Sequence, residues 1–469
     1  MSATNQMPKA DALIIGLGAA GGIAAYVLAN TGLKVVGLEA GPRLDVSDFV
    51  PKMDEVAGGI YSWTGGWKFN HEIPTWRPDA SSPTQAPPIP AIPMANMVGG
   101  TSIHYGTQSW RFRADDFTIR SDTINTYGEE SLPPGSTTAD WPITYDDLEP
   151  YYDQVEYAIG VSGQGGVNPF ESARAREFPL PPMRDMGYSS MMGEAMSSLG
   201  YHPFPQPAAI ISQDYDGRPA CTYCGFCSSY GCWNDSKSST LVSTIRKAEE
   251  TGNLEIRPNA RVLRINSNDQ GQVTGVTYLD ADGNEVEQEA GLVILSTYVY
   301  ENVRLLLLSA SDYYPNGLVN SNGQVGKHYM SHAYVARNGL FPGTRLNLWS
   351  GTTGQAVAMD DLNGDNFDHT GLGFIRGAVI FAGNGNLPIA QSRVLPQGVP
   401  GWGSEYKRWI HENAGSVGSI FAQVEPQPYE DYFLDLDPDV KDPVGLPVIR
   451  VTYSLGENEV KAGTYIDEK

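Results

Sequence analysis

Residues 11–43 read DALIIGLGAAGGIAAYVLANTGLKVVGLEAGPR and carry the clearest structural signal in the chain. ALIIG has the composition of a short buried strand, and Gly16, Gly18 and Gly21 then form a G-x-G-x-x-G turn before an alanine-rich helix. A second strand, KVVGLEA, places the acidic residue Glu39 near its end. The glycines allow a tight turn and close approach of a pyrophosphate, which the helix N-terminus would face. The stretch therefore predicts a dinucleotide-binding βαβ unit.

The composition predicts a large folded protein with no affinity for nucleic acid. The chain has 469 residues, of which 41% are hydrophobic, so two domains are expected. Its 54 acidic residues outnumber the 31 basic ones, and the formal charge of −23 repels phosphate backbones. We expect a soluble chain without a membrane span, because charged and polar residues interrupt the most apolar window, 291–309. The first residues carry no targeting signal, which leaves the compartment open: cytoplasmic, or periplasmic if the chain is exported with a partner subunit.

Further runs extend the pattern: VGGTSIHYGTQSWRF (98–112), SKSSTLVSTIRKAEETGNLEIRPNARVLRI (236–265), STYVYENVRLLLLSAS (296–311) and GQVGKHYMSH (323–332). Together with the opening stretch they resemble the glucose-methanol-choline (GMC) oxidoreductases, whose cofactor is FAD. The resemblance covers most of the chain and implies oxidation of a CH–OH group in a sugar, sugar acid or polyol. It implies that FAD contacts Gly16, Gly18, Ala20, Gly21, Glu39, Ala40, Gly99, Gly100, Thr101, Ser102, His104, Tyr105 and Val262.

His104 follows Gly100 by four residues. In the pyranose-oxidase-like members of the family, a histidine at the matching place is bonded covalently to the flavin. A hydrogen-bonding role would account for the same histidine, so the resemblance leaves both alternatives open.

All four cysteines lie in CTYCGFCSSYGC, residues 221–232. This spacing is too close for two relaxed disulfides. Zinc favours two C-x-x-C knuckles separated by a longer spacer, whereas C-x-x-C-x-x-C runs are typical of iron–sulfur clusters. We therefore predict an iron–sulfur cluster, with zinc, a disulfide or free thiols as alternatives. The predicted ligands are Cys221, Cys224, Cys227 and Cys232.

The same loop, followed by SKSS, resembles the cluster-bearing branch of the GMC family, the large subunits of gluconate and fructose dehydrogenases. Some members hold a three-iron cluster, so the resemblance implies 3Fe-4S or 4Fe-4S and leaves open whether one cysteine is spare. It implies a dehydrogenase that passes electrons to a protein or quinone acceptor, with a small subunit and a haem-bearing subunit as partners. The alternatives are an oxygen-using oxidase without a cluster, and a non-catalytic electron-transfer or assembly subunit.

The catalytic base is the part of the family pattern that the sequence lacks. GMC enzymes use a histidine paired with a second histidine or an asparagine in the C-terminal part of the chain. Residues 439–469 resemble the stretch just upstream, so we expect the pair to lie beyond Lys469 and the activity of this chain alone to be in doubt. His332 and His411 are candidates by elimination, and we name no base. The seven histidines are His71, His104, His202, His328, His332, His369 and His411.

The expected architecture is α/β, with a doubly wound, Rossmann-like FAD-binding domain at 1–335 and a sheet-based substrate domain at 336–469, incomplete at its C-terminal end. The first domain would be built from core pieces 1–45, 95–120 and 221–335, with excursions at 46–94 and 121–220 and the cysteine loop at 221–232. We also expect an acidic helix after Pro142 and a final helix in ENEVKAGTYIDEK, residues 457–469.

Overall fold

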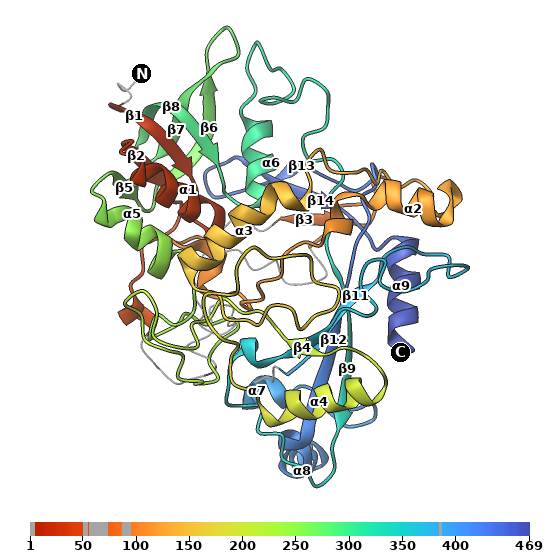
Figure 1. Cartoon of the computed structure of the whole chain (residues 1–469). Coiled ribbons are helices and arrows are strands. Elements are labelled where there is room, and N and C mark those ends of the chain that lie inside the picture. Colours follow the sequence, from red (N-terminus) through yellow and green to blue (C-terminus); the bar gives the residue numbers. More distant parts are fainter. Residues whose placement is uncertain (1–4, 50–54, 56–73, 87–94, 384–386) are drawn as a thin grey trace.

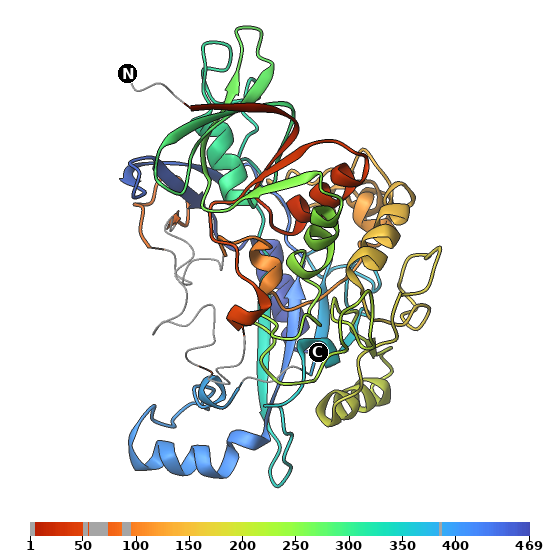
Figure 2. The ribbon, with the colours of Figure 1, turned by 90° about the vertical axis from the view of Figure 1, so that its left-hand side faces the viewer.

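The computed structural model describes residues 5–49, 55, 74–86, 95–383 and 387–469. Two sheets organise the molecule (Figure 1): the sheet that contains the glycine-rich βαβ unit occupies the upper left of this view, and an antiparallel sheet occupies the lower half. A view turned by 90° shows the long strands of the lower sheet running away from the upper one (Figure 2). The expected α/β class with two sheet-based parts is confirmed.

The upper sheet has six strands in the order β5-β2-β1-β8-β7-β6. The first four strands of this order are parallel, and β8, β7 and β6 continue as an antiparallel meander. The bounds are β1 (Asn5–Ile15), β2 (Val35–Leu38), β5 (Leu254–Arg257), β6 (Arg261–Ser267), β7 (Val273–Leu279) and β8 (Glu285–Leu295). Strands β5 and β6 lie on either side of the turn at Pro258 and Asn259.

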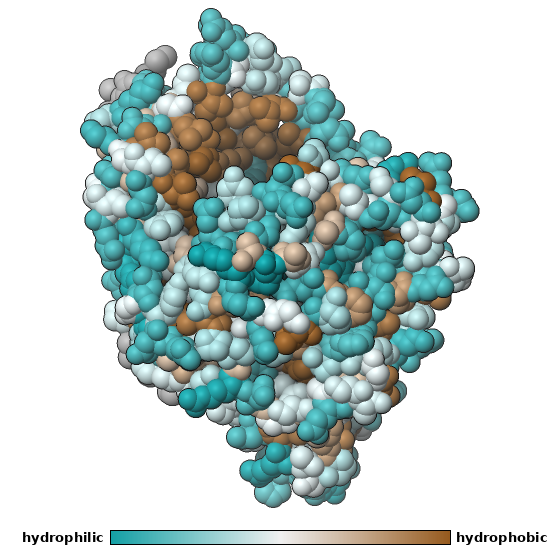
Figure 3. Space-filling view, in the orientation of Figure 1, coloured by the Kyte–Doolittle hydropathy of each residue, from teal (hydrophilic) through white to brown (hydrophobic). Residues whose placement is uncertain are grey.

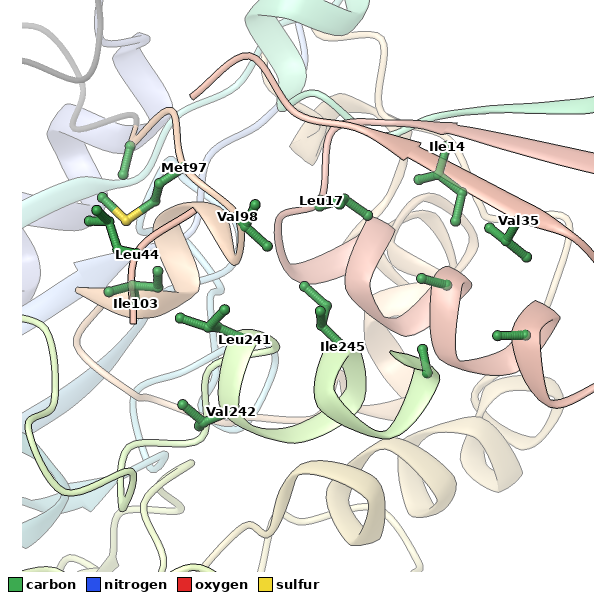
Figure 4. Packing of buried hydrophobic residues seen from close by; sticks show 14 of the residues in the cluster. Ile14, Leu17, Val35, Leu44, Met97, Val98, Ile103, Leu241, Val242 and Ile245 are labelled. Carbon is green, nitrogen blue, oxygen red and sulfur yellow. The ribbon is translucent and has the colours of Figure 1, made fainter. Parts of the chain in front are cut away.

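Strand β1 is apolar at successive positions because helices or strands cover both of its faces. Ala12 and Ile14 pack on one face with residues of α1 (Ala19–Asn30), of the π-helical turn η5 (Leu241–Ile245) and of α5 (Arg246–Glu250). Leu13 and Ile15 pack on the other face against the meander and α6 (Val299–Leu308). Figure 4 shows the first of these cores, with Ile14, Leu17, Leu241 and Ile245 filling the space between the ribbons. This packing fixes the glycine-rich turn relative to residues far away in the sequence.

The lower sheet has five antiparallel strands in the order β4-β10-β11-β12-β9. Its edge strand β4 comes from the 121–220 segment, and β9 begins at Ala333. Helices α4 and α9 contribute to the core on this sheet. The bounds are β4 (Phe204–Pro205), β9 (Ala333–Leu340), β10 (Val357–Met359), β11 (Ala378–Ala382), β12 (Val417–Val424), α4 (Gly187–Ser198) and α9 (Glu457–Asp467).

A small third sheet, in the order β13-β14-β3, packs against α6. The expected acidic helix is present as α3, which begins with a capping box at Thr144, and the expected final helix is α9. No helix within the described ranges is long and apolar enough to cross a membrane. The remaining bounds are β3 (Thr75–Arg77), β13 (Phe433–Lys441), β14 (Pro447–Thr452), α2 (Ile119–Tyr127), α3 (Tyr145–Ile159), α7 (Pro388–Gln391) and α8 (Gly403–Asn413).

Candidate functional site

The turn between β1 and α1, which we call the Gly16 turn (residues 16–21), has the close packing that its motif requires. Gly16 has a φ of +85°, and a Cβ there would lie 2.7 Å from the Ser296 carbonyl oxygen. A Cβ at Gly21 would lie 1.9 Å from the Gly16 carbonyl oxygen, so α1 can begin this close to β1 only with glycine. A Cβ at Gly18 would meet only the Gly100 Cα, at 3.9 Å, and no side chain caps the first turn of α1. The amides of that turn therefore face a space in which an anion can bind.

The Gly99 loop (residues 98–105) lies directly against the Gly16 turn. The Thr240 hydroxyl donates to the Gly18 carbonyl at 3.2 Å and lies 3.3 Å from the Ser102 hydroxyl, which in turn donates to the Gly99 carbonyl at 2.6 Å. The tertiary structure thus gathers eight residues that the sequence analysis predicted as flavin contacts: Gly16, Gly18, Ala20, Gly21, Gly99, Gly100, Thr101 and Ser102.

Glu39 lies at the end of β2 and is 6% exposed. Its carboxylate accepts hydrogen bonds from the backbone amides of Leu17 at 3.0 Å and Gly41 at 3.1 Å. The Ala260 amide donates to the Glu39 carbonyl oxygen at 2.8 Å, so the beginning of β6 lies beside the same strand end. The structure therefore places Glu39, Ala40 and Val262 on one side of the Gly16 turn.

His104, at the end of the Gly99 loop, is 1% exposed and contacts the cysteine loop (residues 221–232) through its backbone. Its carbonyl oxygen accepts a hydrogen bond from the Ser229 amide at 2.8 Å. The Tyr105 hydroxyl donates to the Ser238 carbonyl oxygen at 3.2 Å. Burial, with the positive charge of Lys237 as a smaller cause, lowers the pKa of His104 to about 3. The imidazole is therefore neutral at physiological pH, as either a hydrogen-bonding or a nucleophilic role requires.

This pKa shift predicts a pH dependence of stability. Between pH 6.5 and about pH 3 the unfolded state binds a proton at His104 that the folded state does not, so the free energy of unfolding falls as the pH falls. Replacing His104 with phenylalanine removes this contribution. We expect the stability of wild type relative to His104→Phe to decrease by about 1.4 kcal/mol per pH unit in this window. Urea unfolding of the flavin-free proteins at several pH values measures this difference. If the free energy of unfolding changes with pH equally in the two proteins, the prediction is wrong.

The four cysteines are all free thiols and all partly buried. Burial raises the pKa of Cys221 to about 12, and the neighbouring Cys227 and Cys232 are smaller causes in the same direction. For Cys227 burial also acts to raise the pKa, but Lys237 and the hydroxyls of Thr352 and Thr353 outweigh it and the pKa is lowered. The Thr352 and Thr353 hydroxyl oxygens lie 3.3 and 3.4 Å from Cys227 Sγ.

The donor chemistry of the cysteine loop suits a soft metal, because four thiols near one another can provide thiolate ligands. Their arrangement is not that of an assembled metal centre, however. Among the residues that the structure describes, no three His, Cys, Asp or Glu side chains are placed so that they could hold a metal ion together. The predicted cluster ligands are therefore neighbours that would have to turn toward a common centre.

A cavity of about 920 Å³ lies between the segment that follows the Gly99 loop, the beginning of α6 and the lower sheet. Ser109 and Trp110 line it from the first segment, Tyr298 from the residue before α6, and Gln423 from β12. Tyr298 has a φ of +83° and is 38% exposed, so it borders the cavity and also packs on Tyr300. The cavity therefore reaches from the dinucleotide-binding segments to the lower sheet. Figure 3 shows an apolar region in the upper left of this face, over the upper sheet.

Two histidines line this cavity, His328 and His332. Both ring nitrogens of His328 have partners, the Thr137 hydroxyl at 2.8 Å and the Gln324 side-chain oxygen at 3.0 Å. His332 Nδ1 lies 3.2 Å from the Val424 carbonyl oxygen, to which it can only donate, so Nε2 is the nitrogen able to accept a proton. His411 lies on α8, away from the cavity lining, which removes it from the two candidates. His71 lies outside the described residues.

Comparisons with known proteins agree with this geometry. The GMC oxidoreductase family profile matches residues 136–334. The gluconate 2-dehydrogenase flavoprotein of Pantoea cypripedii is 32% identical over 99% of this chain and 79% of its own length. The chain belongs to the GMC oxidoreductase family. It is also similar to the fructose dehydrogenase large subunit of Gluconobacter japonicus, with 28% identity over 97% of this chain and 81% of that protein.

The solved structure of a formate oxidase variant from Aspergillus oryzae shares the fold, with a TM-score of 0.60 and 16% identity over 100% of this chain and 81% of that one. As a GMC oxidoreductase, the chain is an FAD-dependent oxidoreductase that acts on alcohol or sugar-like substrates. The residues present fit FAD: a Cβ at Gly18 would have only the Gly100 Cα within 4 Å, and the uncapped start of α1 suits a pyrophosphate.

Sequence reasoning missed two groups that shape the site. In the sequence, Lys237 appears only as one residue of the SKSS run, with no sign of a role of its own. In the structure, its ammonium group joins the Gly99 loop to the cysteine loop. Arg376 was not singled out, although it binds Asp115, Asp116 and Glu425 beside the cavity. No local pattern marks either residue, since their partners lie between 7 and 261 residues away in the sequence.

Proposed function

We propose that this chain is the flavoprotein of a dehydrogenase that oxidises a CH–OH group of a sugar, sugar acid or polyol. We propose further that an iron–sulfur cluster in the cysteine loop passes the electrons to a protein or quinone acceptor. The names of the two dehydrogenase relatives support the substrate class. The fit of the Gly16 turn and the Gly99 loop to FAD supports the cofactor site.

One observation carries the electron-transfer part of the proposal. The cysteine loop is hydrogen-bonded to the Gly99 loop, through Ser229 and the His104 carbonyl at 2.8 Å. A cofactor held by these cysteines would therefore lie next to the segment that the flavin contacts. Bound FAD supplies hydride acceptance, and a cluster supplies one-electron transfer.

The chain's own residues would bind and orient the substrate. The cavity that reaches the dinucleotide-binding segments has aromatic walls, including Trp110 and Tyr298, which suit the CH faces of a sugar ring. Polar side chains such as Gln423 and Asn363 also line it and can bond to hydroxyl groups. His332, with Nε2 as its acceptor nitrogen, is the described histidine of the cavity that could take up a hydroxyl proton. A small subunit and a haem-bearing partner complete the proposed enzyme.

The test combines visible and EPR spectra of the protein purified without oxygen. We expect a flavin spectrum together with an iron–sulfur EPR signal, and we expect Cys227→Ser to lose the iron while retaining FAD. Ser228→Ala is the matched control, since it changes an exposed residue of the same loop without removing a thiol. Single serine variants of the other three cysteines, measured for iron content, identify a spare cysteine if there is one. A protein with FAD but no iron, rapidly reoxidised by dioxygen, would show an oxidase instead.

A further inference from the structure

Lys237 is a buried cation at the junction of the two loops. Its residue is 3% exposed. The ammonium group donates to the carbonyl oxygens of Cys227 and Tyr230, at 2.9 Å for Tyr230, and reaches the Tyr105 carbonyl of the Gly99 loop at 3.4 Å. These three carbonyls account for its three N–H donors. The group therefore lies between the cysteine loop and the segment proposed to contact the flavin.

No carboxylate among the described residues lies within ion-pair distance of this ammonium group. The buried Arg376, by contrast, has three carboxylate partners, whereas the buried Arg218 is also held by carbonyl and hydroxyl oxygens. Burying a charge without a counter-charge is costly, because neutral carbonyls replace only part of the lost hydration. A neutral donor would satisfy the same carbonyls at lower cost, so the hydrogen bonds alone do not explain a lysine here.

The cysteine loop lies directly against this unbalanced charge. The Lys237 ammonium group binds the Cys227 carbonyl, and its own backbone amide lies 3.4 Å from Cys232 Sγ. Cysteines that bind a metal do so as thiolates, and a thiolate-bound iron–sulfur cluster is an anion. Such a group would supply the missing negative charge beside Lys237.

We propose that Lys237 is the fixed counter-charge of an anionic iron–sulfur cluster held in the cysteine loop, and that it raises the reduction potential of that cluster. The inference rests on the proposed cluster. Lys237 is a positioning residue: it touches the loop that binds the iron and the loop that contacts the flavin, but no reacting atom. A cation beside the cluster favours the more negative, reduced form, which makes the cluster a better electron acceptor.

The experiment compares wild type with Lys237→Gln, which keeps hydrogen-bond donors without the charge, and with Lys237→Arg, which keeps the charge. Lys247→Met is the matched control, because Lys247 is a cation paired with Asp216 at 2.8 Å rather than with the cysteine loop. For each protein, purified without oxygen, we would measure iron content, the potential of the cluster by EPR-monitored titration, and the thermal midpoint before and after removal of the iron.

We expect Lys237→Gln to lower the potential so that, at the wild-type midpoint, the ratio of reduced to oxidised cluster falls about tenfold, or about 59 mV for a one-electron couple. Lys237→Arg and Lys247→Met should stay within about twofold. We also expect Lys237→Gln to lower the thermal midpoint more in the iron-loaded protein than in the iron-free one, because only the loaded form needs the counter-charge.

Several outcomes would overturn the inference. An unchanged cluster potential in Lys237→Gln, or equal losses of thermal stability with and without iron, would show that the lysine only ties the loops together. A Lys237→Gln chain that fails to fold even without iron would show the same. Absence of iron from the wild type would refute the proposed cluster as well as this inference. Iron in the wild type, together with an unchanged cluster potential in Lys237→Gln, would overturn this inference alone.

Discussion

Replacing Gly18 with alanine should give a folded protein that no longer retains FAD. A Cβ at Gly18 would have the Gly100 Cα, at 3.9 Å, as its nearest neighbour, and the φ of Gly18 is −76°, so the chain itself tolerates alanine. The new methyl group would occupy the open space in front of α1, where a pyrophosphate must approach the helix amides. We expect FAD affinity to fall at least tenfold, or about 1.4 kcal/mol, with little change in the free energy of unfolding.

Two companion variants sharpen this result. Gly21→Ala would place its Cβ 1.9 Å from the Gly16 carbonyl oxygen, so it should destabilise the fold itself by several kcal/mol, of the order seen for overpacked cores. Gly187→Ala at the beginning of α4 meets nothing within 4 Å and is the matched control. Flavin absorbance after gel filtration measures how much FAD is retained, and urea unfolding separately measures the free energy of unfolding. If Gly18→Ala binds FAD with the affinity of the wild type, the pyrophosphate does not bind at this turn and the prediction is wrong.

Replacing Arg376 with methionine should cost the protein about 3–5 kcal/mol of stability. Arg376 is 4% exposed and lies 2.7 Å from Asp115 and 2.8 Å from Glu425, and it also binds Asp116. Burial acts to raise the pKa of Asp115, but Arg113 and Arg376 outweigh it and the pKa is lowered. Removing the guanidinium would leave Asp115 and Asp116 with only Arg113 and, among the described residues, Glu425 with no cation, which is far more costly than losing an exposed ion pair.

The matched control for Arg376→Met is Arg120→Met, since Arg120 and Glu129 form an exposed pair and should contribute less than about 1 kcal/mol. Urea unfolding near neutral pH measures both changes. The carboxylates are ionised there, and the deficit of Arg376→Met should shrink as the pH falls toward their pKa values, because protonation removes the repulsion. Equal effects of the two substitutions would show that the Arg376 network is not a stabilising unit. Asp116 and Glu425 line the cavity, so substrate affinity should fall with stability.

Local sequence was sufficient to predict those parts of the structure that follow a common local motif. The spacing of Gly16, Gly18 and Gly21 predicted the turn, and strands β1 and β2 flank it as expected. Helices α3 and α9 were also predicted, because capping residues and helical periodicity act within a few residues. The family resemblance added FAD and the oxidoreductase class, and the comparisons confirm both.

Long-range packing accounts for what sequence reasoning could not supply. The two-residue strand β4 is too short to carry a pattern, yet it pairs with β10 at the edge of the lower sheet. His332 and His411 were candidates only by elimination, and only the folded chain brings His332 into the cavity while α8 carries His411 away.

The sequence alone therefore defined the chemistry available to this protein: a glycine turn for a dinucleotide, a histidine at the flavin loop and four thiols within twelve residues. These are local features, since each depends on residue types and on spacings of a few positions. Which charges face one another depended on the tertiary structure, because electrostatic interactions act through space rather than along the chain. The fold alone places the Lys237 ammonium group against both loops and joins Arg376 to carboxylates from two distant segments.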